Sequence, residues 1–268
     1  MKRAQKVITQ ARKAIFGEIK PEEIKGLSIN WKTRLQRPDG SQDVGGLSYD
    51  LLLPNKLIGK QMLDLAGNSG QVVRQKLLNG EQTWADLYVS NSAIPVMRAD
   101  RRQAASGGSE QTKQIEALRK EQALLLLQLM LAPSPDFPLI FAYVGETKAS
   151  DGQADVIDVK GTQDFSVRLF IDKITGRLLM MTFQERTFQL RTSAREIRAG
   201  KEVLSKGNSA TIEVKMRLTN HKPINDVVLP HLVTYESEGK VTKEYELKGF
   251  KLNPIFEAAH FEPGKKKK

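Results

Sequence analysis

Short segments in which apolar and polar residues alternate follow one another along almost the whole chain. In "TIEVKMRLTN" every second side chain is apolar: Ile212, Val214, Met216 and Leu218. A period of two is typical of a strand with one buried face. About ten such segments come in sequence, and helix-like segments occur only at the start and in the middle, so crossover helices do not separate the strands. The pattern predicts an α+β fold with one large antiparallel sheet and helices on one face.

Several segments support this prediction individually. "LSINWKTRLQ" (27–36) alternates throughout, and "GLSYDLLLP" and "KLIGKQMLDL" follow it as two more strands. Asn79-Gly80 separates two apolar runs and is a strong hairpin signal. Further strands are predicted at "LIFAYVGE", "DVIDVKG", "LPHLVTYESEG" and "KEYELKGFKLN".

Two segments have helical spacing. Apolar residues recur every three or four positions up to about Phe16, and "KQIEALRKEQALLLLQLMLA" (113–132) is the longest predicted helix, ended by "PSPDFP". Residues from about 90 to 111 are polar, basic and rich in Gly and Ser, so we expect a long excursion there. Residues 186–208 are basic and ambiguous, and residues 264–268 form a basic tail that we expect to be disordered.

The hairpin "DFSVRLFIDKITGRLLMMTFQE" (164–185) departs from simple alternation. Its second arm, "LLMMTF", is apolar on both faces, whereas a half-solvated antiparallel strand is apolar on one. We therefore expect the second face of this arm to meet a helix or a ligand rather than water.

Composition and motifs give no indication of catalysis. The chain has no cysteine, and His221, His231 and His260 have no metal-ligand spacing. Neither a G-x-S-x-G motif nor a phosphate-binding G-x-x-x-x-G-K-[ST] motif occurs. We predict no enzymatic activity, no catalytic residue, no metal and no cofactor.

Part of the net charge of +11 lies in the tail, because four of the lysines belong to the terminal "GKKKK". The other basic residues are interleaved with acidic ones, and no aromatic or glycine-rich nucleic-acid motif accompanies them, so we expect no nucleic-acid partner. The two interpretations left are a solvated basic surface and peripheral attraction to anionic lipid headgroups or an acidic partner.

The apolar residues on the predicted inner face allow two interpretations. They form a filled core, or they line a dry cavity suited to acyl chains. Inward methionines, which adapt to ligands of variable shape, and a central helix with leucine on all sides favour the cavity.

Several phrases resemble the LolA/LolB-like superfamily of periplasmic lipoprotein and lipid carriers, which includes RseB-like members. They are "ARKAIFG…IKGLSINWKTR", "LLLPNKLIGKQ", "LNGEQTWAD", "DVIDVKGTQDFSVRLFIDKITGRLLMMTF" and "VVLPHLVTYESEGKVTKEYELKGFKLNPIFEAAHFEP". The resemblance covers most of the chain, and none of these phrases is a catalytic signature.

The resemblance implies a single domain over residues 1–268, with one strongly curved antiparallel sheet of about eleven strands. Such a sheet is an unclosed barrel whose concave face is covered by helices, with an apolar cavity between them. It further implies a monomeric, non-enzymatic periplasmic carrier, with a signal peptide removed from this chain, that binds acyl chains of lipoproteins or lipids. The alternative is an RseB-like regulatory sensor that binds an envelope protein partner or an apolar ligand.

The predicted ligand-binding residues share one role, which is to supply apolar wall. They are Trp31, Tyr49, Leu51, Met62, Leu124, Leu127, Leu131, Leu169, Ile171, Met180, Val214, Met216, Leu218 and Tyr245.

Overall fold

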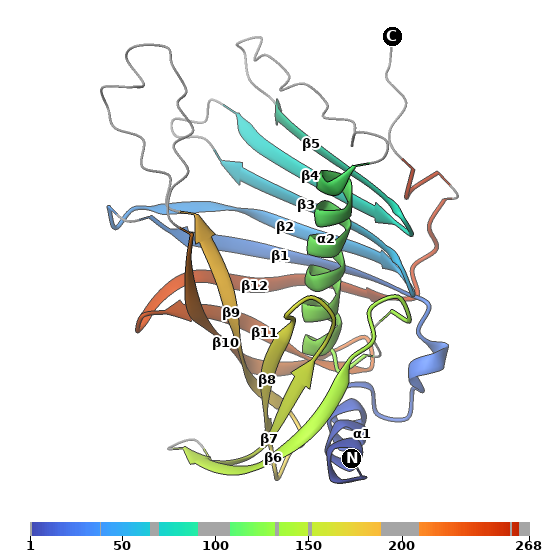
Figure 1. The fold of residues 1–268 in the computed structure, drawn as a ribbon, viewed down its shortest axis with the longest axis vertical. Helices are drawn as coiled ribbons and strands as arrows, with labels where there is room; N and C mark the ends of the chain where they lie inside the picture. The colour runs from blue at the N-terminus through green and yellow to red at the C-terminus, as the bar shows by residue number, and fades with distance from the viewer. Residues whose placement is uncertain are drawn as a thin grey trace.

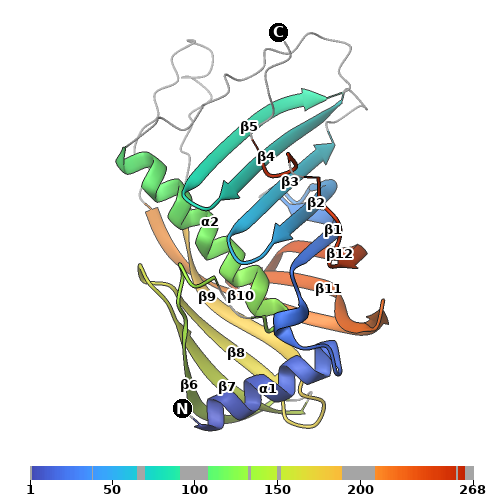
Figure 2. The same ribbon diagram turned by 90° about the vertical axis from the view of Figure 1, so that its right-hand side faces the viewer.

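The computed structural model describes residues 2–37, 39–64, 70–90, 108–131, 134–149, 152–188, 209–257 and 259–262. Twelve strands form one antiparallel sheet that curves without closing; helix α2 crosses the inside of the curve and helix α1 lies across one end (Figures 1 and 2). In chain order the elements are α1 (Lys2–Phe16), a 3-10 turn (Pro21–Glu23), β1 (Gly26–Gln36), β2 (Gln42–Leu52), β3 (Lys56–Asp64), β4 (Gln71–Asn79), β5 (Gln82–Ser90), α2 (Ser109–Gln128), β6 (Ile140–Ala149), β7 (Gly152–Lys160), β8 (Ser166–Asp172), β9 (Leu178–Phe188), β10 (Ser209–Ile224), β11 (Val227–Ser237) and β12 (Lys240–Leu252).

The order of strands in the sheet explains the position of α2. The order is β5-β4-β3-β2-β1-β12-β11-β10-β9-β8-β7-β6, so two meanders are joined by the pairing of β1 with β12. Strands β5 and β6 follow each other in the chain but stand at opposite edges of the sheet. The connection between them must cross the width of the sheet, and α2 makes that crossing within the concave side (Figure 2).

The predicted fold class is confirmed, with twelve strands rather than about eleven. The hairpin at Asn79-Gly80 is confirmed between β4 and β5, where Gly80 has a φ of +62°. Helix α2 begins at Ser109, a few residues before the predicted start at Lys113. Most of the polar excursion predicted for about 90–111, most of the ambiguous segment 186–208 and the tail 264–268 lie outside the described residues.

The main core lies between the concave face of the sheet and the two helices. Helix α1 buries one stripe of side chains, and the second half of α2 is buried on nearly all sides. Strand β1 shows how alternation feeds this core, because Leu27, Ile29, Trp31 and Thr33 are all buried on the concave side. Burial of each large apolar side chain stabilises the fold by about 1.5–3 kcal/mol.

A smaller cluster covers part of the convex face. Ile58, Leu77 and Trp84 on β3, β4 and β5 pack with Phe261 from the C-terminal segment. Strand neighbours of these residues point the other way, since Leu57 and Leu78 belong to the main core. The convex face of this half of the sheet is therefore apolar too, because the segment after β12 folds back over it.

Candidate functional site

The concave face changes character along its length. One end is apolar and faces α1 and the second half of α2. Toward the other end, three tyrosines from strands distant in sequence converge on one carboxylate of α2. We name this group the tyrosine cluster: Tyr49 (β2), Tyr235 (β11), Tyr245 (β12), Glu121 (α2) and Lys76 (β4).

Glu121 connects α2 to two strands of the sheet. The Tyr49 hydroxyl donates a hydrogen bond to Glu121 Oε1 at 2.6 Å, and Lys76 Nζ donates to Glu121 Oε2 in an ion pair. Gly59 on β3, which lies between these strands, makes room for both partners: a Cβ there would lie 3.1 Å from Tyr49 Cε1 and 3.0 Å from Lys76 Cε. The charge of Glu121 is thus balanced by Lys76 of β4.

The other two tyrosines lie against each other. The rings of Tyr235 and Tyr245 are 5.0 Å apart between centroids, with an interplanar angle of 53°. Burial raises the pKa of both hydroxyls and of Tyr49, and the nearby negative charge of Glu121 raises each pKa further. All three side chains are therefore neutral phenols at physiological pH. Lys243 lies 5.4 Å from the Tyr235 ring centroid and 3.7 Å from Glu185 Oε1.

One buried hydroxyl at the same end has no hydrogen bond. Thr33 on β1 has no exposed surface, and its Oγ1 finds no partner among the described residues. Its neighbours across the sheet are Tyr245 on β12 and Gly45 on β2. A buried polar group without a partner costs about 1–3 kcal/mol, so this hydroxyl is unusual for a native interior.

Helix α2 fills the apolar part of the concave face. The space left where Leu125 and Leu129 meet Trp31, Leu247 and Phe250 is about 10 Å³. That volume accommodates about one water molecule and no acyl chain. Of the two interpretations left open by the sequence, a filled interior is observed at this contact, and its filling consists of α2 side chains.

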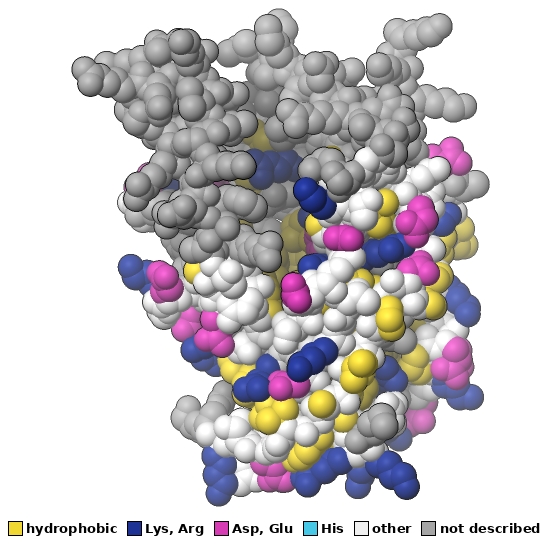
Figure 3. All heavy atoms as spheres, viewed as in Figure 1, with side chains coloured by type: hydrophobic (Ala, Val, Ile, Leu, Met, Phe, Trp, Pro, Cys, Tyr) yellow, Lys and Arg dark blue, Asp and Glu magenta, His cyan; other side chains and the backbone are white. Residues whose placement is uncertain are grey.

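The tyrosine end is more open. Tyr49, Tyr235 and Tyr245 are only partly buried. Figure 3 shows hydrophobic and basic side chains at the floor of a recess beside α2. The concave face is thus fully buried against α2 at its apolar end and less completely buried at the tyrosine cluster.

Most of the predicted wall residues lie on the inner side. Trp31, Leu51, Leu169, Ile171, Val214, Met216 and Leu218 are buried on strands, Leu127 and Leu131 are buried at α2, and Leu124, Tyr49 and Tyr245 are partly buried against the main core. This placement leaves their role in binding a ligand as a prediction.

Met62 and Met180 do not face inward as predicted. Met62 pairs with Gly46, and it is the next residue, Leu47, that pairs with Trp31, so Met62 lies on the convex face. Met180 pairs with Phe170, whereas Met181 pairs with Leu169 and is fully buried in the main core.

A β-bulge explains the second error. The register of β8 and β9 shifts between Phe170 and Ile171, so Ile171 pairs with Leu178. Leu178 and Met181 consequently both face the core although they are three residues apart, which strict alternation does not allow. The second face of this arm carries Met180 half-buried on the convex side, while both described helices lie on the concave side. No described helix covers this face, so of the two expected partners only a ligand stays as a prediction.

Sequence reasoning did not identify Glu121, Lys76 or Thr33 as site residues. Lys76 occupies an inward position of β4, since it pairs with Gly59 and lies between the inward Leu78 and Arg74. A charged residue at an inward position of a strand was the available signal.

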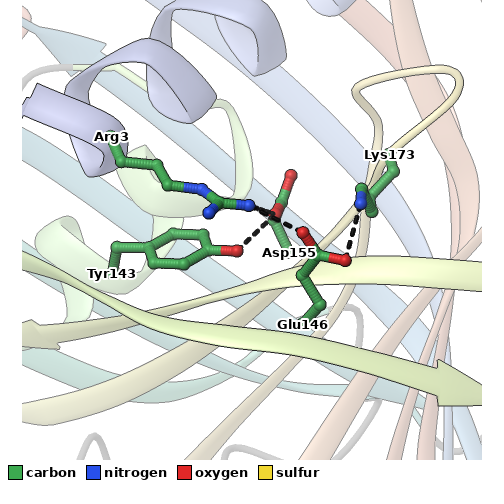
Figure 4. A network of polar contacts seen from close by, with 5 residues as sticks. All are labelled: Arg3, Tyr143, Glu146, Asp155 and Lys173. Carbon is green, nitrogen blue, oxygen red and sulfur yellow. Dashed lines mark hydrogen bonds and ion pairs between the residues drawn. The ribbon is translucent and has the colours of Figure 1, made fainter.

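A second polar network holds α1 in place (Figure 4). Arg3 lies over the ring of Tyr143, 4.1 Å from its centroid, and its Nη2 is 2.6 Å from Glu146 Oε1. The Tyr143 hydroxyl donates to Asp155 Oδ1 at 2.9 Å, and Lys173 Nζ lies 2.7 Å from Glu146 Oε2. A bulge in β6 between Tyr143 and Gly145 turns Glu146 toward Asp155 and α1.

A surface pocket of about 260 Å³ adjoins this network, between α1 and the β8–β9 turn. Its two lysines are paired with carboxylates, Lys13 with Glu18 and Lys173 with Glu146. Arg12 of α1 also donates to the carbonyl oxygen of Met130 at 2.7 Å, which ties α1 to the end of α2. These contacts indicate a structural role for α1 as the anchor of α2.

The described part of the chain contains no group of three or more His, Asp or Glu side chains that could hold a metal ion. None of its helices is long and apolar enough to cross a membrane.

Comparisons with known proteins relate the chain to others by structure. No protein-family model matches the sequence, and no curated protein matches it. Among solved structures, a LolA superfamily protein from Nitrosomonas europaea aligns over 94% of this chain and 94% of its own, with a TM-score of 0.50 and 14% identity. A putative outer membrane lipoprotein-sorting protein domain from Vibrio parahaemolyticus aligns over 97% of both chains with a TM-score of 0.49 and 10% identity. A DUF1329 family protein from Desulfovibrio piger also aligns over 97% of both chains, with a TM-score of 0.49 and 9% identity.

At these identities the similarity concerns the fold alone, and the first of the three structures has the highest TM-score among them. The unclosed antiparallel sheet around a crossing helix, expected from the resemblance in sequence, is the arrangement that the two chains share over nearly their full lengths. The chain has the fold of a LolA superfamily protein.

Proposed function

We propose that this chain is a non-enzymatic binding protein of the bacterial envelope that holds an acyl chain of a lipoprotein or lipid between α2 and the concave face. The observation that carries the proposal is the gradient along that face, from a buried apolar wall to the tyrosine cluster. A ligand with an apolar tail and a polar end matches this order. The shared fold with a LolA superfamily protein supports the same role.

Side chains of α2 fill the space that the ligand would occupy, so a ligand has to displace them. An acyl chain that buries about 14 methylene groups gains about 11 kcal/mol. Four buried leucine side chains, at about 2.5 kcal/mol each, are worth nearly the same. Leu125 of α2 and Leu129 at its C-terminal cap, which contact the wall, therefore cover the site at a free energy that an acyl chain can match.

Polar contacts join α2 to the sheet and to the turn after β2. Glu121 bonds to Tyr49 and Lys76, and the side chain of Gln122 donates to the carbonyl oxygen of Pro54 at 3.2 Å. The two hydrogen bonds to the Glu121 carboxylate contribute about 1.5–3 kcal/mol each and the neutral one about 0.5–1.5 kcal/mol, together less than the roughly 10 kcal/mol of four buried leucines. The free energy of displacing α2 is thus set mainly by the exchange of its leucine contacts for contacts with the acyl chain.

The test is to purify the protein from envelope-containing cells, extract it with organic solvent and identify bound lipid by mass spectrometry. Delipidated protein is then titrated with a fluorescent fatty acid. We expect co-purified acyl lipid and saturable binding. Lipid-free protein that also fails to bind the probe rejects the proposal, and a single stable protein partner captured from an envelope extract would favour the regulatory alternative instead.

A further inference from the structure

The unpaired Thr33 hydroxyl lies in a row of hydroxyls that crosses three adjacent strands. Thr33 on β1 is opposite Tyr245 on β12, and the ring of Tyr245 lies against that of Tyr235 on β11. Within the described residues, Thr33 Oγ1 has no hydrogen-bond partner, and no hydrogen bond contributes to the raised pKa of Tyr235 or Tyr245. Three hydroxyls, each able to donate and to accept a hydrogen bond, therefore face the concave side at the border between its apolar and polar parts.

The charged groups beside this row neutralise each other. Lys76 is paired with Glu121, and Lys243 lies 3.7 Å from Glu185. An anionic headgroup would have to separate one of these lysines from its carboxylate and leave that carboxylate near the partly buried phenols. Arg74, two residues from Lys76 on β4, is exposed and stands apart from the row of hydroxyls.

We propose that Thr33, Tyr235 and Tyr245 form a subsite for an uncharged polar headgroup, of the acylglycerol ester type, at the end of the acyl site. Ester carbonyls accept hydrogen bonds, and glycerol hydroxyls donate and accept them. A headgroup with these groups can therefore pair with the three neutral hydroxyls without disturbing the neighbouring ion pairs. The ligand would satisfy the Thr33 hydroxyl, which has no partner among the described residues. This inference rests on the proposed function, since it assigns the polar end of the same ligand.

The test compares three probes with the same single oleoyl tail: monooleoylglycerol, oleate and monooleoyl lysophosphatidylglycerol. The wild-type protein is expected to bind monooleoylglycerol at least fivefold more tightly than oleate. Thr33→Val keeps the shape of the side chain and removes its hydroxyl, and Tyr235→Phe and Tyr245→Phe remove theirs. Each change is expected to weaken monooleoylglycerol binding about three- to tenfold, as for one lost hydrogen bond, and to leave oleate affinity within twofold. Arg74→Gln is the matched control and is expected to change neither.

Thermal unfolding separates a binding role from a structural one. Thr33→Val removes an unpaired buried hydroxyl, so it is expected to raise Tm of the ligand-free protein while it weakens monooleoylglycerol binding. A rise in Tm with unchanged affinity overturns the inference. Tighter binding of oleate or monooleoyl lysophosphatidylglycerol than of monooleoylglycerol also overturns it, and leaves the proposed function intact. Failure of all three probes to bind refutes the proposed function itself.

Discussion

Truncation of Leu125 separates the stabilising role of α2 from its role as a competitor of the ligand. Leu125 is 5% exposed and lines the small space that Trp31 and Leu129 also line. Leu125→Ala removes three carbon atoms, worth about 2.4 kcal/mol of transfer free energy, and leaves a cavity that adds to the loss. We expect a loss of about 3 kcal/mol in the free energy of unfolding, which lowers Tm by roughly 6–12 °C for a chain of this size.

The same change is expected to strengthen acyl binding. A ligand that displaces α2 no longer has to expose Leu125. If about half of its transfer free energy is recovered, the gain is about 1.2 kcal/mol, or roughly eightfold in Kd. The assay is titration with a fluorescent fatty acid at a temperature well below both Tm values, with denaturant unfolding measured in parallel.

Leu77→Ala is the matched control. Leu77 is 2% exposed in the convex cluster with Trp84 and Phe261, so its truncation costs a similar amount of stability away from the proposed site. We expect its Kd to remain within twofold of wild type. Equal changes in affinity for the two variants, or weaker binding by Leu125→Ala, would refute the reasoning that α2 side chains occupy the acyl site.

Two further predictions concern stability. Burial lowers the pKa of His221 to about 4, with the Arg177 charge as a smaller cause. The unfolded chain takes up this proton near pH 6.5, so stability present above pH 6.5 is lost as pH falls toward 4, by on the order of 2–3 kcal/mol. Urea unfolding at pH 7 and pH 4.5 should show a smaller loss in the free energy of unfolding for His221→Gln than for wild type. Equal losses in the two proteins would contradict the assignment of this pH dependence to His221. The second prediction concerns Gly176, which has a φ of +70° and where a Cβ would lie 3.2 Å from the carbonyl oxygen of Gln10, whereas Gly17 has a φ of +59° with open space around it. Gly176→Ala should therefore lower the free energy of unfolding by more than the roughly 1 kcal/mol expected for Gly17→Ala, and equal losses would show that the α1 contact at Gly176 is unimportant.

The fold was largely predictable because local patterns encode most of it. Ten of the eleven strand pairings join neighbours in sequence, so alternation and turn residues were sufficient to predict a meander. The pairing of β1 with β12 joins Leu27 to Leu252 and has no local signal. The resemblance in sequence, rather than periodicity, supplied the curved and unclosed sheet.

The candidate site was only partly predictable, for two physical reasons. Alternation assigns inward positions only while the register is regular, and the β8–β9 bulge exchanged Met180 for Met181. In addition, the position of Glu121 depends on how α2 is oriented against the sheet, and helical periodicity was uninformative for a helix with leucine on all sides. Tyr49 and Tyr245 were predicted as wall residues, but their convergence on Glu121 is a tertiary feature.

The central claim, that an acyl chain lies between α2 and the concave face, is tested most directly with the two tryptophans of the chain. Trp31 lies beside Leu125 in the main core and Trp84 lies in the convex cluster, and each is 8% exposed. Trp84→Phe leaves Trp31 as the only reporter, and Trp31→Phe leaves Trp84 as the matched control. Each variant is titrated with 9,10-dibromostearate, whose bromine atoms quench tryptophan on contact, and with unbrominated stearate. We predict that the brominated chain quenches Trp31 by at least half at saturation and leaves Trp84 unchanged. Saturable binding that quenches Trp84, or that leaves the fluorescence of Trp31 unaffected, would contradict the account.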